Sequence, residues 1–231
     1  MQLIHLNPQL FNYTMNMQYY FQRFTVLTLI LSALASFSLA QDINFDEPRE
    51  EKLLNDLKVL IWKQPNNGKV TVKLRIHSGA AFDQKDKMGT MALLSEIIFP
   101  DDGIKTFFEE DLEGSLEVVT TYDYIQISAT AKTVELVSLL ETIAPAIINP
   151  EINKKLTAQV KARQLEKVAN LEKDSSYVAD RAAAKKLLGD FPYGRPLEGT
   201  SESLAKIDFA DIILAKQRFL TSDNATLTIS G

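Results

Sequence analysis

The chain of 231 residues contains no cysteine, one tryptophan and only two histidines, His5 and His77. Without cysteine it cannot form a disulfide, a thiolate metal site or a cysteine nucleophile. A site that needs two imidazoles would have to use both histidines. Positive charge is also scarce, because 25 Lys and Arg residues are outnumbered by 30 Asp and Glu and are dispersed, which gives no basis for nucleic-acid binding. The 45% of hydrophobic residues and the net charge of −5 are typical of a globular domain.

The N-terminal region carries a signal for export. Residues 24–40 have no charge, follow Arg23 and end in Ser-Leu-Ala, the small-x-small pattern that signal peptidase recognises. We therefore expect residues 1–40 to be a signal peptide with an N-terminal extension, cleaved before Gln41, that directs the protein to the periplasm or the cell exterior. The alternative is an uncleaved N-terminal membrane anchor, although 17 uncharged residues are at the short limit for a span. After cleavage we expect no stable membrane span, and His77 is the histidine that remains.

The rest of the chain is divided into a short leader, 41–53, and one domain, 54–231. Apolar and polar residues alternate over 70–77, which predicts a half-buried strand. The run 58–62 is the expected partner of this strand in a hairpin that turns at 65–68. Further strands are predicted at 116–121, 124–131 and 225–230, and helices at 88–99, 104–112, 134–148, 151–171, 175–188 and 201–220. This order favours an α+β fold, with a mostly antiparallel sheet and helices packed on one of its faces.

Two blocks of sequence carry a family resemblance. The first, residues 54–100, is LNDLKVLIWKQPNNGKVTVKLRIHSGAAFDQKDKMGTMALLSEIIFP, and the second, residues 189–231, is GDFPYGRPLEGTSESLAKIDFADIILAKQRFLTSDNATLTISG. Together they resemble the insulinase/pitrilysin family of zinc peptidases, which includes the subunits of the mitochondrial processing peptidase. The shared features are the opening strands, a Gly at position 79, a helix that begins at Gly89, and the Pro-x-Gly-Arg-Pro turn. The resemblance implies the α+β fold above, and a second homologous domain that this chain does not contain.

The resemblance also locates a metal site, and the residues there depart from the family's pattern. Active members carry H-x-x-E-H on the first long helix, where two imidazoles one turn apart grip zinc and the Glu activates water. Here those positions are Ala92, Ser95 and Glu96, and the third ligand, a Glu on a later helix, falls at Lys167. Both imidazoles and the general base are replaced. We therefore expect no zinc cofactor and no catalysis.

Two alternatives remain open. One is an active metallopeptidase with a rearranged metal site that uses Glu96 and a distal glutamate, either Glu166 or Glu172. Such an all-oxygen site suits harder cations than zinc. The other alternative is a truncated gene product, in which the surface meant for a second domain is exposed.

The preferred hypothesis is a catalytically silent, exported domain that serves as a binding or scaffold half of a peptide-processing complex. Its implied partners are a peptidase subunit that bears an intact H-x-x-E-H helix, a second homologous domain, or both. The implied ligand is an extended peptide, added as a strand to an exposed edge of the sheet. By resemblance this edge belongs to residues 116–121, with Leu116, Val118 and Thr120 as the candidate binding residues; the strand from Tyr124 is the other candidate.

Overall fold

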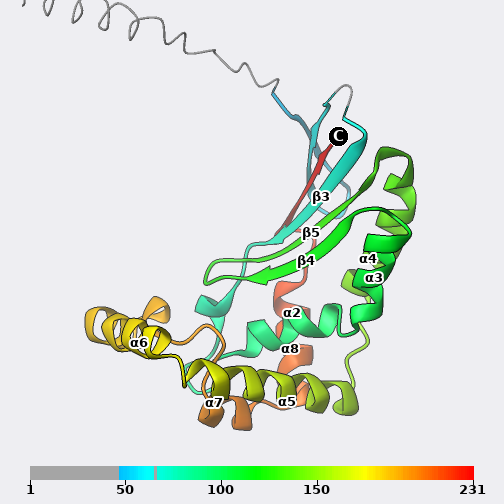
Figure 1. Ribbon diagram of the computed structural model, residues 1–231. Coiled ribbons are helices and arrows are strands. Elements are labelled where there is room, and N and C mark those ends of the chain that lie inside the picture. The colour runs from blue at the N-terminus through cyan, green and yellow to red at the C-terminus, as the bar shows by residue number, and fades with distance from the viewer. Residues whose placement is uncertain (1–46, 65–66) are drawn as a thin grey trace, which may run out of the picture. The chain divides into compact units, whose positions relative to one another are not determined.

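The computed structural model describes residues 47–64 and 67–231. The predicted signal peptide, 1–40, lies outside the described residues. The strands are β1 (Arg49–Lys52), β2 (Lys58–Trp62), β3 (Lys69–Ile76), β4 (Ser115–Thr120), β5 (Ile125–Lys132) and β6 (Ala225–Ser230). They form one sheet in the order β1-β2-β6-β3-β5-β4 (Figure 1). β1 falls within the stretch that the sequence assigned to the leader, 41–53, so part of that stretch belongs to the folded domain.

Alternation of residue type builds the centre of the sheet. On β3, Val70, Val72, Leu74 and Ile76 are buried, and the residues between them are exposed or half-buried. β5 repeats the pattern, with its buried face formed by Ile125, Ile127, Ala129 and Ala131. Every second side chain of a strand faces the same side of a sheet, so both strands present one apolar face to the helices and one polar face away from them.

The predicted hairpin between 58–62 and 70–77 is wrong. β6 lies between the two strands: it pairs in parallel with β2 (Val59 opposite Leu227) and antiparallel with β3 (Val72 opposite Ile229). A parallel pair needs a long crossover connection. All of the chain between β2 and β6 provides it, so the last strand of the domain enters the middle of the sheet.

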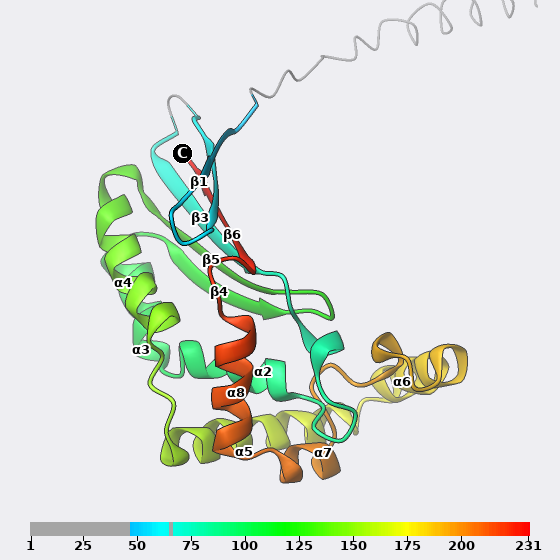
Figure 2. The same ribbon diagram turned by 180° about the vertical axis from the view of Figure 1, so that it is seen from behind.

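The helices cover one face of this sheet, which confirms the predicted α+β fold (Figures 1 and 2). They are α2 (Thr90–Ile98), α3 (Asp102–Glu110), α4 (Leu136–Ile148), α5 (Lys154–Leu171), α6 (Ser175–Leu188), α7 (Ser201–Lys206) and α8 (Phe209–Phe219). Within residues 47–64 and 67–231, none of the helices combines the length and apolar character needed to cross a bilayer. α2 lies between the sheet and α5, beside α8, and every one of its residues except Glu96 is buried. A helix that is apolar all round needs such a position.

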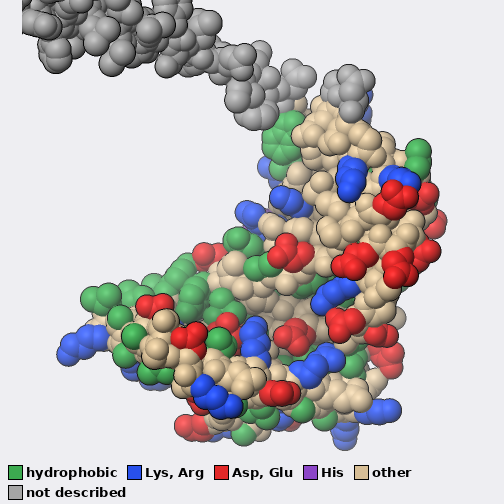
Figure 3. Space-filling view, viewed as in Figure 1, with side chains coloured by type: hydrophobic (Ala, Val, Ile, Leu, Met, Phe, Trp, Pro, Cys, Tyr) green, Lys and Arg blue, Asp and Glu red, His purple; other side chains and the backbone are tan. Residues whose placement is uncertain are grey.

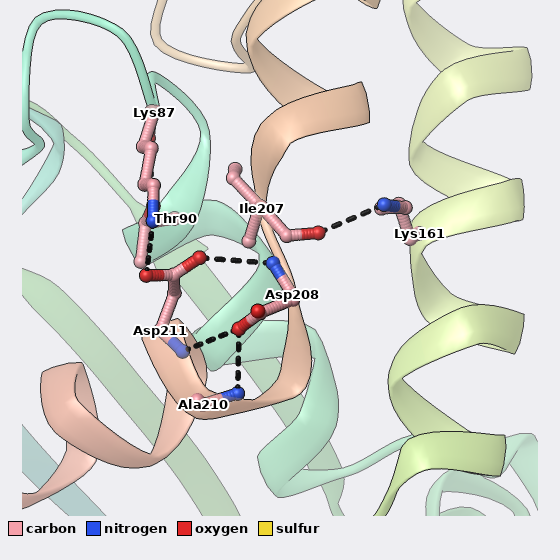
Figure 4. Close-up of polar contacts among 7 residues, drawn as sticks. All are labelled: Lys87, Thr90, Lys161, Ile207, Asp208, Ala210 and Asp211. Atoms are coloured by element: carbon pink, nitrogen blue, oxygen red, sulfur yellow. Dashed lines mark hydrogen bonds and ion pairs between the residues drawn. The ribbon is translucent and has the colours of Figure 1, made fainter.

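The single helix predicted over 201–220 is instead two helices, α7 and α8, divided at Ile207 and Asp208 (Figure 4). The Asp208 carboxylate accepts hydrogen bonds from the N–H groups of Ala210 and Asp211 at 2.8 and 3.1 Å. The Asp211 carboxylate accepts one from the Asp208 N–H at 2.9 Å. This reciprocal capping box satisfies the free N–H groups at the start of α8. Asp211 also pairs with Lys87 at 2.5 Å, which ties α8 to the loop before α2.

This cap gives a stability test. Replacing Asp208→Ala removes both side-chain hydrogen bonds to the start of α8, so we expect the free energy of unfolding in urea to fall by about 1 kcal/mol. The matched control is Asp180→Ala, on the exposed surface of α6, for which we expect a change below about 0.5 kcal/mol. Equal losses for the two variants would contradict the assigned cap.

Candidate functional site

A groove of about 310 Å³ lies where α2, α5 and β4 come together. Its walls come from α2 and the loop after it, from α3, from β4 and from α5. The residues that line it are Ser95, Glu96, Phe99, Pro100, Asp102, Lys105, Leu116, Val118 and Arg163. Two of the three motif positions on α2 and two of the three predicted edge-strand residues are therefore in one place.

Ser95, at the position of the family's general base, is engaged in structural hydrogen bonds. Its side chain is buried, and its Oγ donates to the Ala92 carbonyl at 2.8 Å. The same Oγ accepts a hydrogen bond from Thr120 Oγ1, on β4, at 2.7 Å. The hydroxyl proton is thus occupied, and the bond to Thr120 attaches the edge strand to α2.

Ala92 and Glu96 are one helical turn apart and share a face of α2, as the H-x-x-E-H spacing requires. Ala92 is buried and offers a methyl group. Glu96 is half-buried on the groove wall, and among the described residues it forms no hydrogen bond or ion pair. One carboxylate is all that these two positions supply toward a metal.

On α5 the groove is lined by Arg163, which the sequence analysis did not identify. Lys167 lies one turn further along α5 and is exposed, as are Glu166 and Glu172, and none of the three lines the groove. The sequence did contain a signal for Arg163: it is four residues before Lys167, so the two side chains lie on the same face of α5. Arg163 presents a positively charged guanidinium, which cannot act as a metal ligand, to the groove.

These residues do not fit zinc. Catalytic zinc takes three protein ligands, usually His with Glu or Cys. The groove instead offers the carboxylate of Glu96, the carboxylate of Asp102 paired with Lys105, a hydroxyl that is already bonded and the positive charge of Arg163. Nowhere in the described ranges, 47–64 and 67–231, do three or more His, Asp or Glu side chains gather to hold a metal ion. His77 is on the exposed face of the sheet, where its Nε2 lies 2.9 Å from Thr226 Oγ1.

α2 is held in place by a buried carboxylate at its N-terminus. Asp83 Oδ2 accepts a hydrogen bond from the Gly89 N–H at 2.7 Å, and Oδ1 accepts one from the Met91 N–H at 2.9 Å. Gly89 has φ of +95°, in the left-handed region that favours glycine. Burial raises the pKa of Asp83 to about 7, against the lowering effect of these N–H groups and of Arg195.

The second block of the family resemblance packs on the same helix end. Arg195, from the Pro-x-Gly-Arg-Pro turn, donates to the Asp83 carbonyl at 3.2 Å. Ser203 donates to the carbonyl of Met88 at 2.8 Å, and Gln164 of α5 donates to the carbonyl of Glu198 at 3.0 Å. The two sequence blocks are therefore partners in space, and together they set where α2 begins.

β4 is an edge strand whose outer side is open. The Thr121 N–H donates to the Tyr124 carbonyl at 2.8 Å. Because hydrogen-bonded positions alternate along an antiparallel pair, Val119, Glu117 and Ser115 also direct their main-chain groups toward β5. The residues between them, Leu116, Val118 and Thr120, direct their main-chain groups away from β5. No strand of the described part of the chain pairs with that side. In the strand order β4 lies at the edge, whereas β5, the strand that follows Tyr124, lies between β3 and β4.

A family model for insulinase, peptidase family M16, matches residues 58–201, which is more than half of the chain. The chain therefore belongs to the insulinase (M16) family. No curated protein sequence matches it.

Among solved structures, the chain is similar to a putative M16-like peptidase from Alicyclobacillus acidocaldarius, with 16% identity and a TM-score of 0.73 over 84% of this chain. It is also similar to a peptidase M16 inactive domain from Pseudomonas fluorescens, with 17% identity and a TM-score of 0.72 over 80% of this chain. A protease from Helicobacter pylori is similar as well, with 14% identity and a TM-score of 0.75 over 80% of this chain. At these identities the likeness shows the fold. The match covers 47%, 47% and 46% of those chains, so this chain spans about half their length.

The buried carboxylate predicts a pH dependence of stability. The pKa of Asp83 is about 7 in the folded protein and 3.8 as its ordinary value, so folding takes up a proton between these limits. Its contribution to the free energy of unfolding is therefore complete below about pH 4 and is lost as the pH rises to about 7. We expect Asp83→Asn to remove this decline, measured by urea unfolding at several pH values. The control Glu166→Gln, on the exposed face of α5, should keep it, and an unchanged decline in Asp83→Asn would contradict the assignment.

A second prediction tests which α5 residue faces the lost metal position. The variant Ala92→His, Ser95→Glu, Glu96→His restores the motif on α2 but leaves Arg163 in the groove, so we expect weak zinc binding. Adding Arg163→Glu should tighten zinc binding by about tenfold or more relative to adding Lys167→Glu, measured by competition with a chromogenic chelator. If the variant with Lys167→Glu bound zinc more tightly than the variant with Arg163→Glu, position 167 would be the third-ligand position, as the resemblance implies.

Proposed function

We propose that this chain is a non-catalytic M16 domain that binds extended peptides by strand addition to β4. The observation that carries the proposal is the position of the open edge of β4 directly beside the groove. A peptide paired with β4 would hydrogen-bond to the main chain of Leu116, Val118 and Thr120 at the usual spacing of about 4.8 Å. Such bonds give affinity with little demand on the peptide's sequence.

The groove gives such a peptide a place for one of its side chains. Successive side chains of an added strand alternate between the two faces of the sheet. Those on the helix side enter the space lined by Glu96, Arg163 and Val118. Both charged groups lack partners among the described residues, so either is available to a polar side chain of the peptide.

The absence of hydrolysis is part of the proposal. A peptidase of this family needs a metal-bound water and a carboxylate base at the position that Ser95 occupies. Ser95 is bonded to Ala92 and Thr120, and the donor set does not fit zinc. The similarity in fold to a protein described as an M16 inactive domain supports this view.

We further propose that the domain works with other subunits. The partners that membership of this family suggests are a second homologous domain and a peptidase subunit with an intact H-x-x-E-H helix. The apolar segment 24–40 supports export of the protein through a signal peptide, to the periplasm or the cell exterior.

The test is a substitution that closes the open edge without touching the sheet. In Val118→Pro the missing N–H is the one that points away from β5, so the strand can keep its pairing. We expect binding of a fluorescein-labelled 12-residue peptide rich in Thr and Val to weaken by about tenfold or more, measured by fluorescence anisotropy.

Val118→Thr is the matched control, because it keeps a β-branched side chain and the outward N–H, and we expect its affinity to stay within about twofold of the unchanged protein. Circular dichroism and urea unfolding confirm that both variants are folded. Equal affinity for the two variants would overturn strand addition at β4. Release of peptide fragments by the purified protein, abolished by Glu96→Gln, would establish the rearranged metallopeptidase instead.

A further inference from the structure

Three aromatic rings form a stack on the surface beyond the end of β4. The Tyr122 and Tyr193 rings have centroids 5.1 Å apart, and the Tyr193 and Phe191 rings follow at 5.7 Å with an interplanar angle of 14°. Phe191 is 58% exposed and Tyr193 39%. We call Tyr122, Tyr193 and Phe191 the aromatic ladder. Phe191 is its outer member, with one ring face against Tyr193.

Polar bonds, rather than burial, hold the ladder in place. The Tyr122 hydroxyl donates to the Arg195 carbonyl at 2.7 Å, and the Tyr193 hydroxyl donates to the Asp123 carboxylate. Arg181 of α6 donates to the carbonyls of Gly194 and Arg195 at 2.7 and 2.8 Å, which fixes the turn that carries Tyr193 and Phe191. Rings held in this way lose little conformational entropy when a ligand packs on them.

The ladder is continuous with the open edge along the chain. Tyr122 is two residues past Thr120, in the turn that joins β4 to β5, and Figures 1 and 2 both place this turn next to the α6 end of the domain. Gly79, which follows β3, lets the main chain there pack closely against this turn, because a Cβ at position 79 would lie 2.2 Å from the Thr121 carbonyl oxygen. A peptide paired with all six residues of β4 would arrive at the ladder within one or two residues of Thr120.

Ion pairs and exposed apolar side chains both lie near the ladder: Asp190, next to Phe191 in the chain, pairs with Lys85 and Lys185. Val178, Leu187 and Leu188 of α6 are all exposed, at 47%, 82% and 44%. Figure 3 shows hydrophobic side chains gathered over this end of the molecule, with charged side chains among and beside them. The chemistry on offer is therefore that of an aromatic side chain, which packs against other rings in an offset stack.

We propose that the aromatic ladder is a second recognition site for the peptide bound at β4, and that it selects an aromatic residue one or two positions beyond the segment paired with β4. The inference rests on the proposed function, since strand addition brings the peptide to the ladder. The Phe191 ring face that Tyr193 does not cover receives the aromatic side chain, and the α6 leucines shield it from water. β4 supplies affinity without regard to sequence, and the ladder supplies selectivity.

The experiment uses three labelled 12-residue peptides with the same Thr/Val-rich centre, carrying one Phe near the N-terminus, one Phe near the C-terminus, or Ser at both places. We expect the full-length protein to bind one of the Phe peptides about tenfold more tightly than the Ser peptide. The preferred Phe position reports the direction of the added strand. Phe191→Ser should remove the preference while leaving the affinity for the Ser peptide unchanged, because the Phe191 side chain is 58% exposed and is not part of β4.

Val137→Ser is the matched control, since Val137 on α4 is 64% exposed and far along the chain from the ladder. This variant should keep the Phe preference. If the unchanged protein binds all three peptides equally, or if Phe191→Ser keeps the preference, the ladder proposal is overturned and strand addition stands. If no peptide binds, or if Val118→Pro has no effect on any of them, the proposed function itself fails.

Discussion

The buried carboxylate of Asp83 fixes the N-terminus of α2, and the rest of the site depends on that position. Asp83 joins the two sequence blocks that carry the family resemblance, because its carboxylate accepts hydrogen bonds from N–H groups at the start of α2 while its main-chain carbonyl accepts one from Arg195. Ser203 adds a bond from the other side, to Met88. α2 is therefore placed by the protein's own hydrogen bonds, and no metal is needed to hold it against the sheet and α5.

Because α2 is placed in this way, the walls of the groove do not depend on a bound metal ion. In a metal-binding relative, a Glu at position 95 would face the metal-bound water. Here Ser95 bridges Ala92 and Thr120, so the replacement adds a link between α2 and the edge strand. In the proposed non-catalytic domain, this exchange would replace a base by an anchor for β4. A binding surface can use that exchange, because strand addition needs an edge that stays in place and needs no proton transfer.

The local elements were predictable from the sequence, and their pairings were not. The alternation of apolar and polar residues predicted β3 and β5, and both α6 and β6 begin and end at the residues predicted from the sequence. The parallel pairing of β6 with β2 brings together segments more than 160 residues apart, for which a single sequence carries no register signal. The break before α8 had a visible cause in Asp208 and Asp211, but the apolar repeat on both sides concealed it. Arg163 was missed because the resemblance directed attention to Lys167.

When a peptide binds to an open sheet edge by strand addition, its affinity and its selectivity come from different contacts. In the proposed binding mode, main-chain hydrogen bonds to β4 would be the same for nearly every peptide, so a domain that relied on them alone would bind any unfolded chain. Discrimination has to come from side-chain sites at fixed distances along the edge. The described structure offers two of them, a polar groove with Glu96 and Arg163 beside β4 and the aromatic ladder just past its end. A peptide that used both sites would need a polar residue and an aromatic residue separated by the distance between the groove and the ladder. That spacing would distinguish a ligand from the many other chains that can pair with an open edge.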